Sequence, residues 1–299
     1  MIKNRELHYS TPSEIKLFQE TRLKETLQYL AEHSPFYKRM FADNSINIDD
    51  IKTIEDLTKI PTTSKNDLQS NNADFLCVDS VDIIDYVTTS GTLGEPVTFA
   101  LTEGDLQRLA YNEASSFTMA GCTKEDVMQL MTTIDRRFMA GLAYFMGARE
   151  LGCGVVRVGN GIPELQWDTI KRVKSSVCMV VPSFLMKMVD FAQNNNIDYN
   201  NSTLKRAICI GEALRNPDGE LTTLGKKISE QWGALELYST YASTEMQTSF
   251  TECEAHEGGH IPADLIIVEL LDDNEQPVKD GEPGEVTITT IGVEAMPLL

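Results

Sequence analysis

Between about residue 81 and residue 243, short β-rich runs alternate with helical stretches, and this alternation constrains the fold more than any other feature. Runs such as DVMQLMTT, GVVRVGN, SSVCMVVP and LKRAICIG are each followed by a helical pattern. Strand and helix alternate five times. Such a sequence predicts an α/β fold with mainly parallel sheets and flanking helices.

The two ends of the chain have residue patterns that differ from that of the middle region. Residues 12–45 have helical spacing of apolar side chains, with a break expected at Ser34-Pro35. After residue 260, the runs DLIIVELLDD and EVTITTIG flank a KDGEPG turn, which predicts an antiparallel hairpin. We therefore predict three parts: a helical segment over 1–80, an α/β core over 81–260 and a β-rich part over 261–299.

The composition excludes several classes of protein. With 45 acidic and 26 basic residues, the net charge is −19, which repels nucleic acid and anionic membranes. The six cysteines are scattered without a C-x-x-C pair, as expected for reduced thiols. There is no apolar signal core and no apolar span of membrane length. We expect a soluble, cytoplasmic protein that binds neither nucleic acid nor membranes.

The stretch TTSGTLGEP combines hydroxyl side chains with two glycines between two predicted strands. Gly91 and Gly94 permit positive φ and close approach of a ligand. Hydroxyl groups and successive backbone N–H groups can bind phosphate. The stretch lacks the Lys of a Walker loop. On the residues alone, a phosphate loop and a simple glycine turn are equal alternatives.

Two further polar segments follow predicted strands, in CIGEALRN and in YSTYASTEM. In an α/β sheet, ligands bind beyond the carboxyl ends of the strands. Glu245 could hold Mg²⁺ there, between phosphate oxygens. Two structural alternatives stay open: a strand-to-helix turn at Gly211-Glu212, and a helix cap with Glu245 in the first helical turn.

In this order and separation, the three segments resemble the motifs of the adenylate-forming ligase superfamily. Runs such as SPFYKRMF, GARELGCGVVRVGNG and VVPSFLMKMVDFA are similar to the phenylacetate–coenzyme A ligase branch, and the resemblance extends from about residue 12 to the end. It implies the large domain of an AMP-forming ligase. Such an enzyme activates a carboxylate with ATP to acyl-AMP and then forms a thioester with coenzyme A.

The resemblance also implies roles for individual residues. Thr244 and Glu245 would be catalytic, with Thr244 at the α-phosphate and Glu245 on Mg²⁺. The ATP- or AMP-binding positions would be Thr89, Ser90, Gly91, Thr92, Gly94, Gly211, Glu212, Ala213, Tyr241, Ala242 and Ser243. The predicted acyl pocket contains Arg136, Phe138, Pro182 and Ser183.

Two positions depart from the family pattern. Glu95 stands where the family usually has a basic or neutral residue, and an acid beside a triphosphate is unfavourable without a counter-charge. Asp135, Arg136 and Arg137 replace apolar or small residues. We therefore expect a carboxylate that is more polar or larger than phenylacetate. A solvated helix start is an equal alternative for the two arginines.

The family pattern continues beyond the MPLL run into a ribose-binding Asp segment, a hinge and a small C-terminal domain with a catalytic Lys. We expect the chain to lack these parts and to be an incomplete ligase. The alternative is a truncated, non-catalytic relative that binds nucleotide or coenzyme A. The family often forms dimers, so a homodimer is an open prediction.

A last cluster, ECEAHEGGHIP, holds three side chains that can bind Zn²⁺. Cys253, His256 and His260 are ligand types that zinc accepts, but a fourth ligand is not obvious. Two glycines between the histidines disfavour a regular helix. Zinc and a hydrogen-bonded surface turn are therefore alternatives for this segment.

Overall fold

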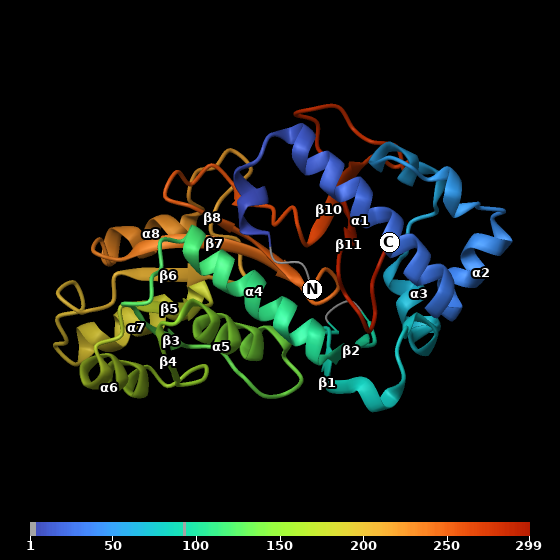
Figure 1. The fold of residues 1–299 in the computed structure, drawn as a ribbon. Coiled ribbons are helices and arrows are strands. Elements are labelled where there is room, and N and C mark those ends of the chain that lie inside the picture. Colours follow the sequence, from blue (N-terminus) through green and yellow to red (C-terminus); the bar gives the residue numbers. More distant parts are fainter. Residues whose placement is uncertain (1–3, 92–93) are drawn as a thin grey trace. The chain divides into compact units, whose positions relative to one another are not determined.

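The computed structural model describes residues 4–91 and 94–299 (Figure 1). Its strands are β1 (Ile83–Thr88), β2 (Thr98–Thr102), β3 (Val127–Leu130), β4 (Gly154–Arg157), β5 (Val177–Val180), β6 (Arg206–Cys209), β7 (Glu236–Ser243), β8 (Thr248–Glu252), β9 (Gly259–His260), β10 (Ile266–Leu271) and β11 (Glu285–Thr290). Its α-helices are α1 (Pro12–His33), α2 (Pro35–Asp43), α3 (Lys65–Ser70), α4 (Glu103–Met119), α5 (Met139–Leu151), α6 (Pro163–Val173), α7 (Pro182–Asn194) and α8 (Thr223–Gln231).

The chain forms two compact units. The first unit consists of residues 1–108, 244–248 and 262–299, and the second of residues 109–243 and 249–261. The boundaries thus fall inside α4 and near the turn between β7 and β8. The predicted division at residues 80 and 260 stays a prediction about domains.

The second unit is built on a sheet of seven strands in the order β4-β3-β5-β6-β7-β8-β9. The pairs from β4 to β7 are all parallel, and β8 pairs with β9 in the antiparallel sense. The predicted α/β class with a mainly parallel sheet is confirmed. All four residues of β5 are buried, as expected for a central parallel strand with helices on both faces.

Helices cover both faces of this sheet (Figure 1). On one face, Phe117 near the end of α4 and Tyr144 of α5 pack with the inward side chains of the strands. On the other face, α6, α7 and α8 contribute Trp167, Leu185 and Ile228 to a second apolar cluster. Each helix buries one apolar stripe, which is what the helical spacing in the sequence predicts.

In the first unit, a short 3₁₀-helix (Arg5–Tyr9) precedes α1, whose N-terminus is closed by reciprocal hydrogen bonds between Thr11 and Glu14. Leu23, Leu27 and Leu30 lie on one face of α1 and are fully buried. The helix ends at His33, and Pro35 begins α2, so the predicted break at Ser34-Pro35 is confirmed.

The late strands of the first unit form the predicted antiparallel hairpin. β10 pairs with β11 from Ile266 opposite Thr290 to Leu271 opposite Glu285. The apolar run 295–299 is buried, and the Leu298 N–H donates to Thr290 Oγ1 at 2.8 Å. This run therefore packs as a part of the hairpin's core.

Two alternatives that the sequence left open fail, and two short strands were not expected. The fifth helix begins at Met139, because Arg136 and Arg137 have φ values of 60° and 62°, which no right-handed helix contains. Glu245 lies in a turn between two strands, so the helix-cap alternative fails. Strands β8 and β9 were not expected, since TSFTE is short and polar and gives a weak strand pattern.

Among the described residues, no helix combines the length and apolar character needed to cross a membrane.

Candidate active site

Several predicted site residues of the second unit lie just after the strands of its parallel sheet. Arg136 and Phe138 follow β3, Pro182 and Ser183 follow β5, and Gly211 follows β6. Since β3, β5 and β6 are parallel, these segments share the carboxyl edge of the sheet. The edge is open: Gly211, Glu212 and Ala213 are exposed, and Tyr241 near the end of β7 is 59% exposed.

Glu212 connects two of these segments. Its carboxylate accepts hydrogen bonds from the Ser183 N–H and the Ser183 hydroxyl, both at 2.8 Å. Ser183 lies in the first turn of α7, where free N–H groups and the helix dipole favour a negative charge. The structure thus joins a predicted nucleotide-binding residue to a predicted acyl-pocket residue.

Arg215, three residues after Glu212, is held by the buried carboxylate of Glu252. The Arg215 Nε atom donates to Glu252 Oε2 at 2.7 Å, and the Ser239 N–H donates to Glu252 Oε1. His256 Nδ1 lies 3.3 Å from the same Oε1 atom. Glu252 therefore ties the segment after β6 to β7 and β8, beside the open edge.

The first unit holds the glycine-containing loop between β1 and β2. Thr89 closes it, because its N–H donates to Val97 O and its hydroxyl accepts from the Val97 N–H, both at 3.0 Å. Gly91 has a φ of 68°, and a Cβ atom there would lie 2.9 Å from Pro96 Cγ. Only glycine fits this position. Thr92 lies outside the described residues.

The exit of this loop is fixed from α3. The side-chain amide of Gln69 donates a hydrogen bond to the backbone carbonyl of Glu95. The Glu95 carboxylate is exposed and has no hydrogen-bond partner among the described residues. Gly94, with a φ of 129°, precedes it. The base of the loop is thus anchored, and both of its glycines have positive φ, which fits a phosphate loop and a simple glycine turn alike.

Thr244 and Glu245 also belong to the first unit, in the turn between β7 and β8. The Glu245 side chain is half-buried, and none of the side chains in the described ranges pairs with its carboxylate. Two residues later, Gln247 has a φ of 49° and its carbonyl accepts from Arg108 at 2.7 Å. This turn therefore presents an unpaired carboxylate on a fixed backbone.

The zinc alternative gains no support from the geometry. Within residues 4–91 and 94–299, no group of three or more His, Cys, Asp or Glu side chains is arranged to hold a metal ion. The His256 ring packs against Tyr238, with ring centroids 5.2 Å apart, and His260 lies in β9. The trio of Cys253, His256 and His260 is thus not brought together, and zinc stays a prediction.

Sequence reasoning missed four ionisable residues that shape these segments: Arg108, Glu113, Arg215 and Glu252. Arg108 and Glu113 lie on α4 among apolar and small residues, and both are buried. Burial raises the pKa of Glu113 to about 8, and its carboxyl accepts hydrogen bonds from the neutral donors Asn112 and Ser249. A charged residue on the apolar face of a predicted helix is the signal that could have identified Arg108 and Glu113, whereas no such signal marks Arg215 or Glu252.

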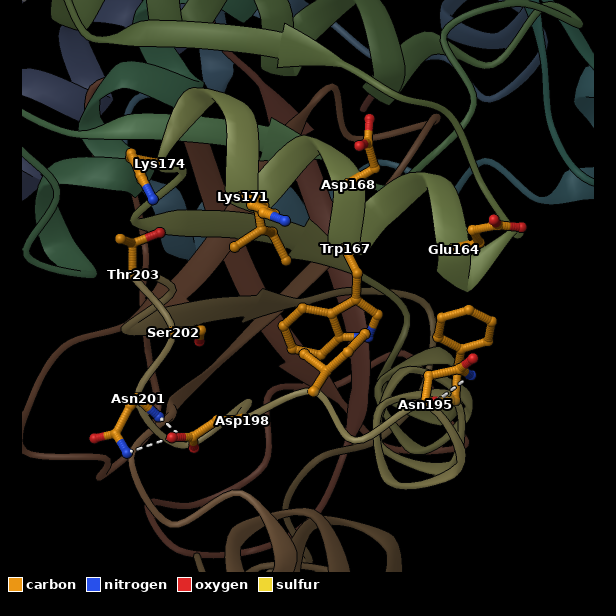
Figure 2. A pocket seen from close by; sticks show the side chains of 13 residues that line it. Glu164, Trp167, Asp168, Lys171, Lys174, Asn195, Asp198, Asn201, Ser202 and Thr203 are labelled. Carbon is orange, nitrogen blue, oxygen red and sulfur yellow. Dashed lines mark hydrogen bonds between the residues drawn. The ribbon is translucent and has the colours of Figure 1, made fainter.

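Figure 2 shows a pocket of about 470 Å³ in the second unit, lined by α6, the end of α7 and residues 195–203. Trp167 and Ile170 form its apolar wall, and Lys174 and Thr203 lie just before β5 and β6 begin. The pocket therefore extends to the amino ends of the strands. None of the predicted site residues lines it.

Comparisons with known proteins agree with this geometry. A family model described as AMP-binding enzyme matches residues 24–295. The phenylacetate-coenzyme A ligase of Pseudomonas putida is 27% identical over 289 residues, which are 95% of this chain and 64% of that protein. The ligase of the same name from Thermus thermophilus is 28% identical over 305 residues, covering 100% of this chain and 66% of that protein. The chain thus spans about two thirds of the length of these curated relatives.

Solved structures show the same fold. A 2-hydroxyisobutyryl-CoA ligase in complex with 2-HIB-AMP and CoA, in its thioesterification state, has a TM-score of 0.86 at 23% identity. It covers 96% of this chain, which covers 62% of that one. O-succinylbenzoate coenzyme A synthetase from Bacillus subtilis, in complex with ATP and magnesium ion, has a TM-score of 0.53 at 17% identity over 70% of this chain and 41% of its own. Since the family model spans residues 24–295, this chain belongs to the AMP-binding enzyme family.

Proposed function

We propose that this chain is the ATP-using part of an AMP-forming carboxylate–coenzyme A ligase, similar to phenylacetate-coenzyme A ligases. One observation carries the proposal: the polar segments after β3, β5 and β6 share an open carboxyl edge, in a chain of the AMP-binding family. Sheets of this kind bind their ligands at that edge.

The proposed reaction has two steps. A carboxylate oxygen attacks the α-phosphorus of ATP, the bond from that phosphorus to its bridging oxygen breaks, and pyrophosphate leaves with acyl-AMP formed. The thiol of coenzyme A then attacks the acyl carbon, loses its proton, and displaces AMP. Positioning of the reactants and stabilisation of phosphate charge are what the protein must supply.

By the family resemblance, the glycine-containing loop and the turn between β7 and β8 would serve the phosphate end of ATP. Ser90, Gly91 and Gly94 would bind the pyrophosphate through hydroxyl and backbone N–H groups, supported by the positive φ of both glycines. Thr244 would contact the α-phosphate. Glu245 would hold Mg²⁺, and its unpaired carboxylate is an oxygen donor of the kind that this ion prefers. When bound, Mg²⁺ supplies charge neutralisation to the phosphates.

By the same resemblance, the segments after β5 and β6 and the end of β7 would serve the adenine and the acyl group. Gly211, Glu212 and Ala213 would border the adenine, with Tyr241–Ser243 beside the nucleotide. The two hydrogen bonds from Ser183 to Glu212 support a fixed distance between the adenine segment and the acyl segment. Arg136 lies in an exposed turn, which favours a substrate acid with a further polar group.

A non-catalytic relative that binds nucleotide or coenzyme A is the second candidate. The exposed carboxylate of Glu95 favours it, because an acid beside the phosphate loop opposes a triphosphate. ATP–pyrophosphate exchange with a panel of carboxylates separates the two: exchange that needs one acid supports the ligase. A cytoplasmic location, a homodimer and a zinc ion stay predictions.

Nucleotide binding to the 299-residue chain tests the proposal directly. We expect calorimetry to detect ATP binding that strengthens with Mg²⁺, and we expect Glu245→Gln to remove most of that strengthening, since the variant lacks the charged ligand. Glu254→Gln is the matched control, an exposed acid after β8. ATP binding that is equally Mg²⁺-dependent in both variants would contradict the role of Glu245.

A further inference from the structure

Arg108 is a fully buried charged side chain of the first unit, with 0% exposure. Among the residues that the structure describes, no carboxylate lies at hydrogen-bond distance from it. Its guanidinium donates to three backbone carbonyls: Nη1 to Gln247 at 2.7 Å, Nη2 to Leu265 at 2.6 Å and Nε to Ile291 at 2.8 Å. Burial lowers the pKa of Arg108 to about 10, so the group stays charged at neutral pH.

The first of these carbonyls belongs to the turn that carries Glu245. Gln247 has the left-handed backbone conformation, which costs a non-glycine residue free energy. Its buried side-chain amide has no hydrogen-bond partner among the described residues. The hydrogen bond from Arg108 to the Gln247 carbonyl is therefore a contact that can hold this conformation.

We propose that Arg108 is a positioning residue for Glu245. By binding the carbonyl two residues after Glu245 and two carbonyls near the late hairpin, Arg108 fixes the turn against β10 and β11 of the same unit. The inference rests on the proposed function, in which Glu245 binds Mg²⁺. Lysine cannot replace arginine here. The planar guanidinium of arginine reaches three carbonyls at once, and a single ammonium group does not.

The test measures how much Mg²⁺ the chain needs to bind ATP. For Arg108→Lys, we expect the Mg²⁺ concentration at half-effect to rise about tenfold, as for other residues that orient a metal ligand. We expect AMP affinity in EDTA to change less than twofold. An unchanged Mg²⁺ dependence in a folded Arg108→Lys chain overturns the proposal.

Gln19→Leu is the matched control. Gln19 is buried and donates to the carbonyls of Ala263 and Ile266, which flank the Leu265 carbonyl bound by Arg108, but it does not contact the 244–248 turn. The variant should lower the unfolding temperature and leave the Mg²⁺ dependence unchanged. An equal shift in both variants would mean that general destabilisation is responsible, and it would overturn the proposal.

If Arg108→Lys does not fold, amide hydrogen exchange of the wild-type chain tests the proposal instead. We expect residues 244–248 to exchange as slowly as the ends of β7 and β8, since the turn is clamped. Fast exchange of the turn overturns the proposal. Glu245→Gln separates the two claims: if it leaves the Mg²⁺ dependence intact, the proposed function fails, whereas an effect of Glu245→Gln without one of Arg108→Lys removes only the inference.

Discussion

Arg108 and Arg215 each hold a segment that carries predicted site residues, but they do so with different partners. Arg108 is fully buried in the first unit and binds three neutral carbonyls. Arg215 is partly exposed in the second unit and pairs with the buried carboxylate of Glu252. Arg108 therefore fixes backbone groups only, whereas Arg215 also neutralises the buried charge of Glu252.

This difference shows which side chain contributes most to stability in each region. Burying the charge of Arg108 costs free energy. Arg108 stabilises the fold because it donates hydrogen bonds to three backbone carbonyls at once. Around Arg215, the buried partner is Glu252, which also accepts from the Ser239 N–H. Removing Glu252 therefore leaves both a cation and a backbone donor without their acceptor.

The largest effect on stability in this comparison is expected from Glu252→Gln. We expect a loss of about 3 kcal/mol of unfolding free energy, because the partly exposed guanidinium of Arg215 loses its charged, buried acceptor. Urea denaturation of the 299-residue chain measures this. Glu254→Gln, two residues away and exposed, should change the free energy by less than about 0.5 kcal/mol. Equal effects of the two variants on the free energy of unfolding would contradict the stabilising role of Glu252.

A buried carboxyl without a cation sharpens the comparison further. The Glu113 carboxyl accepts hydrogen bonds from Asn112 and Ser249, and burial raises its pKa from 4.5 to about 8. Below pH 4.5, the carboxyl is protonated in both the folded and the unfolded chain. Between pH 4.5 and 8, it ionises only in the unfolded chain, so its contribution to stability falls as the pH rises.

Glu113→Gln removes this dependence, because the amide does not ionise. Between pH 5.5 and 7, we expect the variant to gain about 2 kcal/mol of unfolding free energy relative to the wild type. Denaturation curves at several pH values measure the difference. A constant difference across this pH range would show that Glu113 is already ionised in the folded chain.

Much of the fold could be predicted from the sequence, because local patterns carry it. The alternation after residue 81 predicts the parallel sheet, and Ser34-Pro35 marks the boundary between α1 and α2. Strands β8 and β9 could not be predicted, since their pairing depends on β7 and on contacts such as that between Thr240 and Thr251. Short polar strands carry no periodicity strong enough to identify them.

The candidate site divides in the same way. Gly91, Gly211 and Glu245 belong to motifs, so the sequence identifies them as site candidates. The partners that hold these segments come from far along the chain: Arg108 is 139 residues from Gln247, and Arg215 is 37 residues from Glu252. No local pattern predicts such contacts. The left-handed conformation of Arg136 and Arg137 is likewise set by the turn before α5.

The central claim is that nucleotide binds at the predicted motifs. Hydrogen exchange of the 299-residue chain, with and without ATP and Mg²⁺, measures this most directly. We predict slower exchange on ligand addition in residues 86–98, 206–216 and 237–248, with no change in the pocket segments 164–174 and 191–203. Protection confined to those pocket segments, or no protection at saturating ATP, would contradict the account.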